Sequence, residues 1–238
     1  ASLACALAPL GYRVAVVEAV PVRAATQPSY DDRTLVLSHS SCRILDGLGM
    51  WQMLEGRTTP VREVIVTELG RPGRVVMQPL EMGLDAFGHV VEAREFGAAV
   101  MAQMTRLDGI DLHCPTQVTG VTVTENAASL AIDGEGGAAA IGARLVVAAD
   151  GARSAVRRIL DIPARTHDYR QTAVICNVTP ERPHGNRAFE RLTATGPFAL
   201  LPHSGDRCGL VWSVDGEAAG QFLGMPEDEF LAANPQIT

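Results

Sequence analysis

Hydrophobic residues at the start of the chain first follow a helical pattern and then a strand pattern. Residues 1–7, ASLACAL, are small and apolar and predict a helix, and Gly11 is typical of a helix end. Residues 13–17, RVAVV, predict a short strand, and Glu18 follows it directly. Helix, strand and carboxylate in this order are typical of nucleotide-binding α/β folds, in which an acid after the second strand binds a ribose.

The position of Glu18 also predicts what should precede it. In dinucleotide-binding folds the ribose-binding acid lies about 20 residues after the first glycine of a GxGxxG turn. Counting back from Glu18 puts that glycine ahead of Ala1. The alternative is that Glu18 is a solvated strand end, and this segment alone leaves both interpretations open.

Helical and strand spacing alternate through the next part of the chain. Residues 38–49 predict a helix with a serine cap and a stop at Gly49, and residues 92–107 predict a longer amphipathic helix. Between them, alternation over residues 61–69 and 74–80 predicts two strands.

The second half of the chain predicts mostly strands. Short extended pieces predict an antiparallel meander that ends in a buried strand over residues 145–149, and a helix over residues 153–160 follows. Residues 197–202 and 207–214 flank the turn-like HSGD and predict a hairpin. The pieces assigned to the meander are residues 110–114, 117–125, 128–134 and 143–150.

The segment VVAADGARSAVRR carries the second candidate site. A buried strand would deliver Asp150 to a tight turn, and Gly151 would permit a positive φ or a close backbone approach. The N–H groups at the start of the following helix would point back at that turn, which suits a pyrophosphate. The alternative is an ordinary strand-turn-helix connection in which Asp150 caps the helix.

Composition narrows the class of protein. With 238 residues and 47% apolar composition the chain can bury a large core, as one large domain or two small ones. We expect a cytoplasmic protein, because there is no run of about 18 apolar residues and no signal peptide. A net charge of −7 without a basic stripe argues against a nucleic-acid partner.

Residue usage also excludes several chemistries. The five cysteines and six histidines show no metal-ligand spacing, so we expect reduced thiols and no metal site. All twenty basic residues are arginine, which excludes a phosphate-binding loop or a Schiff base that depends on lysine. No catalytic triad is recognisable, and no catalytic residue is assigned.

Six segments together resemble one family, the single-component FAD-dependent aromatic hydroxylases of ubiquinone biosynthesis. They are VVEA, DDRTLVLSHSSCRILDGLGMW, GHVVEAREF, GIDLHCPTQV, RLVVAADGARSAVRR and AFERLTATGPFALLPHSGDRCGLVWS. Within the family they look most like the 2-polyprenyl-6-methoxyphenol hydroxylases. The resemblance implies an α/β fold, with a Rossmann-like FAD-binding domain of the para-hydroxybenzoate hydroxylase type and a β-rich substrate domain.

The same resemblance implies the domain boundaries and a truncation at both ends. The FAD-binding domain would comprise residues 1–60 and 90–162, and the incomplete substrate domain residues 61–89 and 163–238. A GxGxxG turn would precede Ala1 and a GD motif would follow Thr238. Because two of three cofactor-binding segments would then be missing, we expect this chain alone to bind FAD weakly and to be inactive.

The family's cofactor residues can be placed by motif. The resemblance implies that Arg94 lies at the FAD, although an arginine that is solvated or paired with a surface acid is the alternative. Glu18 matches the ribose-binding acid, Arg33 the arginine near the flavin and its phosphates, Val118 the adenine side, and Asp150 with Gly151 the DG motif that serves both FAD and the reduced nicotinamide.

The reaction implied by the resemblance uses NADH or NADPH to reduce FAD, and a flavin hydroperoxide then hydroxylates a phenol. The cofactor supplies this chemistry, while the protein positions the ring and excludes water. We expect Phe198, Pro202 and Trp212 to cover a polyprenylated phenol, with plain sheet core as the alternative. The polyprenyl tail suggests peripheral contact with the inner membrane, or association with other ubiquinone-biosynthesis proteins, although no amphipathic anchor is visible.

Three other functions fit parts of the sequence. Another FAD-dependent oxidoreductase of the same fold, such as a halogenase or a prenyl reductase, would share Glu18 and the Asp150 turn. However, Trp51 and Trp212 do not form the paired-tryptophan motif of flavin halogenases. A truncated product could act only as a binding module. A nicotinamide-only dehydrogenase is disfavoured by the long β-rich second region.

Overall fold

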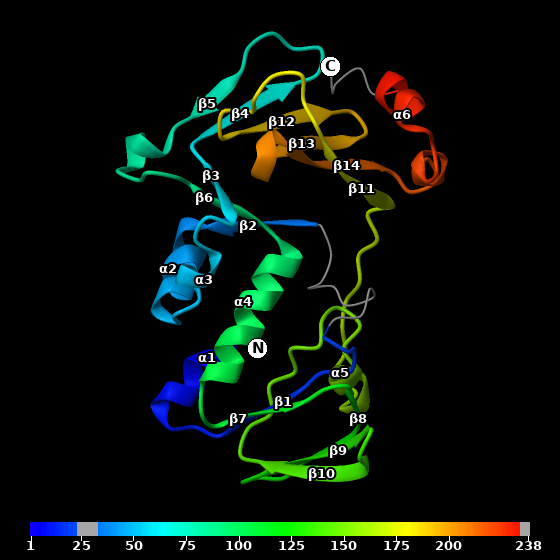
Figure 1. Ribbon diagram of the computed structural model, residues 1–238. Coiled ribbons are helices and arrows are strands. Elements are labelled where there is room, and N and C mark those ends of the chain that lie inside the picture. Colours follow the sequence, from blue (N-terminus) through cyan, green and yellow to red (C-terminus); the bar gives the residue numbers. More distant parts are fainter. Residues whose placement is uncertain (23–32, 234–238) are drawn as a thin grey trace. The chain divides into compact units, whose positions relative to one another are not determined.

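The structure is a computed structural model that describes residues 1–22 and 33–233 (Figure 1). It divides the chain into two compact units: unit 1 comprises Ala1–Tyr30 and Val100–His167, and unit 2 comprises Asp31–Ala99 and Asp168–Thr238. One of these divisions falls inside helix α4 (Ala93–Arg106). The sequence places its domain boundaries elsewhere, and its assignment of a cofactor domain and a substrate domain stays a prediction.

Two strands that are distant in the sequence pair in unit 1. β1 (Val14–Val17) runs parallel to β7 (Ile110–His113). α1 (Ser2–Leu7) and the 3₁₀ turn η1 (Ala8–Leu10) precede β1, and Gly11 closes that turn with a φ of +84°. The predicted helix, its glycine stop and the first strand are therefore confirmed.

The predicted meander forms, but from different segments. β8 (Thr116–Val123), β9 (Ala128–Gly134) and β10 (Gly137–Ala143) make an antiparallel sheet in the order β10-β9-β8. The sequence prediction missed β10, because its glycines and alanines have weak strand propensity. It also placed residues 110–114 in the meander, whereas β7 in that segment pairs with β1.

The predicted buried strand over residues 145–149 is wrong. This segment is not paired with any strand of the described residues, and Leu145 and Val147 are 77% and 53% exposed. A strand requires a neighbour for its backbone N–H and C=O groups, so apolar composition alone did not decide the structure here. The helix after it, α5 (Ala155–Ile159), is shorter than predicted and lies beside β8 (Figure 1).

Unit 2 contains a six-stranded sheet in the order β11-β14-β13-β12-β4-β5. All neighbouring strands are antiparallel except β4 and β12, which are parallel. The predicted hairpin is confirmed, and it puts Phe198 opposite Trp212 with η3 (Ser204–Asp206) at its turn. The strands are β4 (Glu63–Glu68), β5 (Val75–Met77), β11 (Gln171–Val178), β12 (Arg187–Thr193), β13 (Gly196–Pro202) and β14 (Cys208–Asp215).

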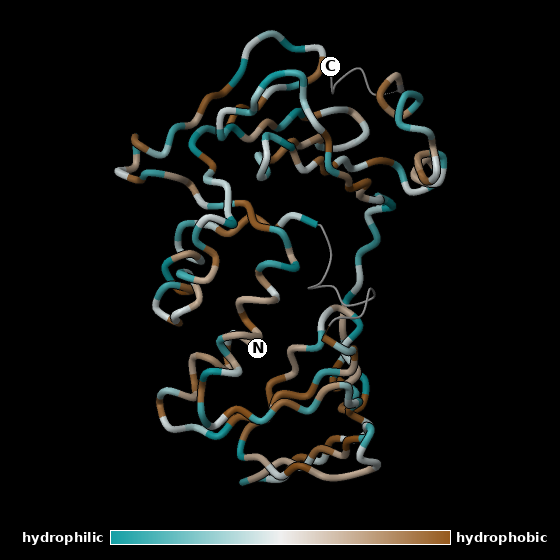
Figure 2. The backbone as a smooth tube through the Cα atoms, viewed as in Figure 1, coloured by the Kyte–Doolittle hydropathy of each residue, from teal (hydrophilic) through white to brown (hydrophobic). Residues whose placement is uncertain are grey.

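One face of this sheet carries a core of unit 2. Phe198, Leu210 and Trp212 are 3%, 0% and 9% exposed, and they pack with η4 (Ala219–Phe222) and with a residue of α6 (Glu227–Ala233). Along β14, the buried Leu210, Trp212 and Val214 alternate with the more exposed Val211, Ser213 and Asp215, and Figure 2 colours the backbone of these strands by hydropathy. This alternation is expected of strands that bury one face.

A second, three-stranded sheet of unit 2 leads into α4. It comprises β2 (Thr34–Ser38), β6 (Gly88–Glu92) and β3 (Thr58–Val61) in the antiparallel order β2-β6-β3. As predicted, a serine caps the helix that follows β2, because Ser38 Oγ accepts the N–H of Ser41 at 3.2 Å. The remaining elements are α2 (His39–Gly47), α3 (Trp51–Leu54) and η2 (Pro79–Met82).

Candidate functional site

Glu18 in unit 1 is half-buried at the carboxyl end of β1. Its N–H donates to His113 O at 2.9 Å, and its carbonyl accepts the N–H of Thr116 at 2.8 Å. Its side-chain Oε1 accepts the N–H of Val20 at 2.9 Å. The carboxylate is therefore held beyond the end of a parallel strand, where open α/β sheets bind their ligands.

Asp150 accepts hydrogen bonds at the start of helix α5, whose N-cap residue is Ser154. Its Oδ1 accepts the hydroxyl of Ser154 at 2.5 Å, and its Oδ2 accepts the N–H of Val156 at 3.1 Å. Ser154 in turn accepts the N–H of Arg157 at 3.0 Å, so the helix begins at Ala155 instead of residue 153. Asp150 therefore contributes to capping, which the sequence left open as the alternative, but through Ser154 and Val156, and the N-cap residue itself is Ser154.

The capping contacts also keep Asp150 charged. Desolvation raises the pKa of this carboxyl, but hydrogen bonds from Ser154 and from backbone N–H groups, including that of Val156, outweigh it and lower the pKa below its usual value. Next to it, Gly151 has a φ of +79°, and a Cβ there would meet nothing within 4 Å. The backbone of this turn is thus open on the glycine side.

A cavity of about 570 Å³ lies beside this turn, within unit 1. Residues of β8, β9, α5 and the segment before Gly151 line it, and most of them are apolar. Its polar lining includes Glu125, Arg144, Ser154 and Arg157. Neither Glu18 nor Val118 lines it; Val118 lies half-buried on β8, opposite Ile132 and next to a bulge.

In unit 2, strand pairing brings together the segments that carry Arg33 and Arg94, two of the residues predicted to bind the cofactor. Thr34 is opposite Glu92 in the β2–β6 ladder, and the N–H of Ala93 donates to Arg33 O at 2.8 Å. The backbone of Arg33 therefore lies next to the turn from β6 into α4, which carries Arg94. The Arg33 side chain is exposed.

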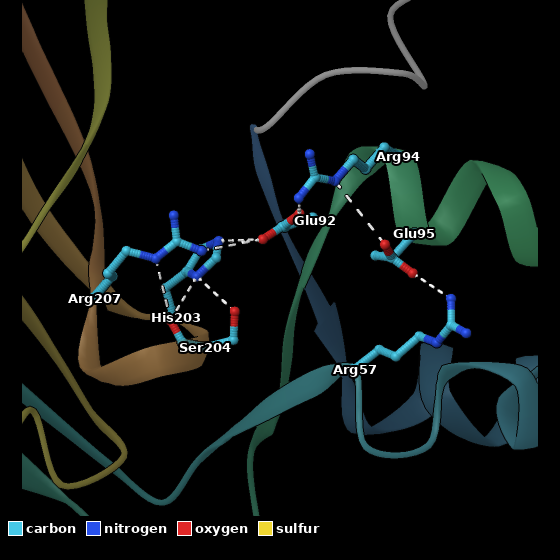
Figure 3. A network of polar contacts seen from close by, with 7 residues as sticks. All are labelled: Arg57, Glu92, Arg94, Glu95, His203, Ser204 and Arg207. Carbon is cyan, nitrogen blue, oxygen red and sulfur yellow. Dashed lines mark hydrogen bonds and ion pairs between the residues drawn. The ribbon is translucent and has the colours of Figure 1, made fainter. Parts of the chain in front are cut away.

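Glu92 is the centre of a charged network that the sequence did not predict (Figure 3). Its side chain is 11% exposed, and its Oε2 lies 2.6 Å from Arg94 Nη2. Its Oε1 lies 3.4 Å from Arg207 Nη2 and 3.2 Å from His203 Nε2. Two arginines and a histidine, from α4 and the β13–β14 turn, thus meet at one nearly buried carboxylate.

The network extends from Arg94 toward the surface. Arg94 Nε lies 4.0 Å from Glu95 Oε1, and Arg57 Nη1 donates to Glu95 Oε2 at 2.6 Å (Figure 3). Arg94 is therefore paired with acids, as the sequence allowed, but its closer partner Glu92 is nearly buried. The acid two residues before Arg94, at the end of an apolar strand, was the available signal for this pairing.

The three predicted substrate residues lie in the sheet's interior. Phe198, Pro202 and Trp212 are all buried, and the rings of Phe198 and Trp212 are 6.3 Å apart. Trp212 Nε1 is buried without a hydrogen-bond partner among the described residues. This is the arrangement that the alternative of a plain sheet core expects, and a role in substrate binding stays a prediction.

Three further observations concern the described part of the chain. Within residues 1–22 and 33–233, no cluster of three or more His, Cys, Asp or Glu side chains is placed to hold a metal ion. No helix in these same ranges combines the length and apolar character needed to cross a membrane. All five cysteines are free thiols.

Comparison with known proteins identifies the class. The family described as FAD binding domain matches residues 1–219, so the chain belongs to this family of flavoproteins. PqsL of Pseudomonas aeruginosa, solved in complex with 2-aminobenzoylacetate, aligns with a TM-score of 0.82 at 21% identity, covering 99% of this chain and 63% of that one. The predicted flavoprotein monooxygenase fold is therefore confirmed.

Sequence relatives narrow the comparison further. Ubiquinone hydroxylase UbiL of Rhodospirillum rubrum is 34% identical over 232 residues, which cover 97% of this chain and 53% of that protein. The 3-demethoxyubiquinol 3-hydroxylase of Escherichia coli is 29% identical over 215 residues, which cover 89% and 54% respectively. The predicted resemblance to ubiquinone hydroxylases is confirmed, and the chain spans about half the length of these relatives.

Proposed function

We propose that this chain is part of an FAD-dependent monooxygenase that hydroxylates a polyprenylated phenol in ubiquinone biosynthesis, with NADH or NADPH as reductant. The observation that carries the proposal is the FAD-binding family match through residues 1–219. The match includes Glu18 and the Asp150 turn. The names of the relatives from Rhodospirillum rubrum and Escherichia coli support the choice of substrate class.

The residues of unit 1 fit one end of such a cofactor. Glu18 is held at the end of β1 and would accept hydrogen bonds from the ribose hydroxyls. Gly151 would allow close approach to the backbone, because no neighbouring atom occupies the space of a Cβ there. Asp150 would act mainly by fixing this turn, since both of its oxygens already accept hydrogen bonds from α5. Val118 would contact the adenine.

The candidate residues of unit 2 would contact the cofactor phosphates and help to enclose the phenol. Arg33 and Arg94 would pair with phosphate groups of the cofactor, because guanidinium groups match phosphate geometry. Bound FAD supplies the redox chemistry that activates oxygen. The buried Phe198, Pro202 and Trp212 would contribute by shaping the hairpin that faces the phenol and by excluding water.

The proposed substrate also implies a place of action. A polyprenyl tail partitions into a bilayer, so the enzyme must collect its substrate from a membrane surface or from another protein. We therefore propose a cytoplasmic enzyme that contacts the inner membrane peripherally or associates with other ubiquinone-biosynthesis proteins.

Absorbance tests the proposal directly. The complete gene product should purify yellow and should consume NAD(P)H when a prenylphenol is added, whereas the 238-residue chain alone should be colourless. In the complete protein, Glu18→Gln should weaken FAD binding about tenfold, because the neutral amide is a poorer partner for a diol.

Asp133→Asn, at an exposed position of β9, is the matched control and should bind FAD like the parent. A complete gene product that purifies without flavin and does not bind added FAD would contradict the proposed function. Equal FAD affinities for the Glu18 and Asp133 variants would remove Glu18 from the cofactor site.

A further inference from the structure

Arg207 shares the carboxylate of Glu92 with Arg94, although neither the sequence nor the comparisons assign it a role (Figure 3). Both guanidinium groups remain partly accessible, since the side chains of Arg94 and Arg207 are 46% and 42% exposed. A nearly buried carboxylate thus holds two half-exposed arginines that come from different elements.

The network carries a surplus of positive charge. In the series Arg207, Glu92, Arg94, Glu95, Arg57, arginines and acids alternate, and both ends are arginines. Its three arginines and two acids have a formal charge of +1, while the whole chain has −7. A local excess of guanidinium groups on a nearly buried acid favours an anionic ligand, because such groups bind carboxylate and phosphate with strong, directional hydrogen bonds.

The β13–β14 turn holds Arg207 in place. The N–H of His203 donates to Arg207 O at 2.8 Å, and Arg207 Nε donates to Ser204 O at 3.3 Å. His184 accepts the N–H of Asn186 at its Nδ1, which leaves Nε2 to donate to His203 O at 3.0 Å. The backbone that carries Arg207 is therefore fixed before any ligand binds.

Close packing also ties this turn to the strand that begins beside Arg33. A Cβ on Gly209 would lie 2.7 Å from Thr34 Oγ1, so only glycine allows β14 to approach β2 this closely. Thr34 follows Arg33 and is opposite Glu92. Arg33, Arg94 and Arg207 therefore all lie on segments that meet at Thr34 and Glu92.

His203 also lies at the shared carboxylate of Glu92. Its side chain is 2% exposed, and its Nε2 lies 3.2 Å from Glu92 Oε1. The small cavity that Glu92, His203 and Thr59 line, about 10 Å³, has room for no more than about one water molecule, so a phosphate would have to bind at the exposed guanidinium groups.

We propose that Arg94 and Arg207 form one anion-binding pair, positioned by Glu92, that holds a phosphate group of an adenine dinucleotide. This inference rests on the proposed function, which supplies the two dinucleotides, FAD and NADPH. Arg207 is then a further binding residue. Glu92 is a positioning residue, because it acts through the two arginines and its own negative charge would repel a phosphate.

Binding measurements on the complete gene product, stripped of flavin, test the inference. FAD is titrated while the quenching of flavin fluorescence is followed, and NADPH affinity is measured separately. Arg207→Met should weaken FAD binding about 10- to 100-fold, because a charged hydrogen-bonding partner of a phosphate is lost. Glu92→Gln should weaken it in the same direction, and Arg207→Lys should restore part of the affinity.

Two comparisons separate this role from a structural one. Riboflavin has no phosphate, so its affinity should be the same for the parent and for Arg207→Met. Arg187→Met is the matched control, because Arg187 is 51% exposed and likewise pairs with a carboxylate, at 2.9 Å from Glu63 Oε1. It should bind FAD and NADPH like the parent. Arg207 is half-exposed, so its variant should fold even if Glu92→Gln does not.

The outcomes distinguish the sources of the phosphate. Loss of NADPH affinity with unchanged FAD affinity would support the pair and assign the phosphate to NADPH. FAD and NADPH affinities of Arg207→Met equal to those of Arg187→Met would overturn the inference, as would an equal loss of riboflavin affinity. A parent protein that binds no FAD would instead contradict the proposed function itself.

Discussion

At the scale of single residues, Asp150 combines a structural contact with a titratable charge. Its two oxygens accept hydrogen bonds from Ser154 and from the N–H of Val156, and these bonds lower its pKa. A carboxylate that accepts hydrogen bonds at the start of a helix stabilises the fold more when it is ionised than when it is protonated. The stability of unit 1 should therefore depend on pH through this residue.

Asp150→Asn should lower the free energy of unfolding by about 1 kcal/mol at pH 7, because the amide nitrogen cannot accept one of the two hydrogen bonds that the carboxylate accepts. Because the pKa is lower in the folded chain than in the unfolded one, the contribution is fully present above the ordinary Asp value of about 3.9 and is lost as the pH falls through the folded value. The difference from the parent should therefore shrink below about pH 4. Urea denaturation followed by far-UV circular dichroism measures this difference in the free energy of unfolding, with Asp133→Asn as control. A difference that stays constant down to pH 3 would contradict the stabilising role of the Asp150 carboxylate.

Some of the candidate residues could be predicted because their positions follow from local sequence. Glu18 and Asp150 each come directly after an apolar run, and such positions are visible without a fold. Glu92 and Arg207 could not be paired in this way. Their contact depends on how the β13–β14 turn packs against the β2–β6 ladder, and no local pattern encodes that packing.

At the scale of elements, the aromatic residues of the β13–β14 hairpin have two interpretations, which are contact with a substrate and packing in the core of the sheet. Phe198 and Trp212 are opposite each other and pack with Phe222 of η4, whose ring lies 4.7 Å from that of Trp212. On the neighbouring strand β11, Ile175 is 46% exposed. The six-stranded sheet therefore offers a buried side chain, Phe198, and a half-exposed one, Ile175, for comparison.

Phe198→Ala should lower the free energy of unfolding by about 3 to 5 kcal/mol, because it leaves a cavity in a packed core. Ile175→Ala should cost less than about 1.5 kcal/mol, since much of that side chain already contacts solvent. Urea denaturation followed by tryptophan fluorescence gives both values. If the two variants lose equal stability, Phe198 does not have the core role assigned to it here.

Elements with strong periodicity were predicted, and elements that depend on a neighbour were not. The amphipathic α4 matches its predicted range within a residue at each end, because its spacing of apolar residues is clear. The alanine-rich β10 forms since β9 offers it a partner. Residues 145–149 are the opposite case: a strand-like composition without a paired neighbour in the described residues.

At the scale of the whole molecule, the cysteines share one chemical state. Burial raises the pKa of all five thiols, and none forms a disulfide. The reactive form of cysteine is the thiolate, so raised pKa values and limited access both slow its reactions. This applies in unit 1 and in unit 2 alike.

The native chain should therefore react slowly with an aromatic disulfide reagent at pH 8, whereas five thiols should react rapidly in denaturant. The absorbance of the released thiolate counts them in both conditions. Two or more thiols that react in the native chain as fast as free cysteine would contradict the burial described here.

Both tryptophans of the chain, Trp51 and Trp212, belong to unit 2. Tryptophan fluorescence therefore reports the unfolding of unit 2 and does not report the unfolding of unit 1. If the two units unfold at different temperatures, a thermal scan recorded only by tryptophan fluorescence would show one of the two transitions. Any difference between the midpoint of this scan and that of a backbone-sensitive signal, such as far-UV circular dichroism, measures how independently the two units unfold.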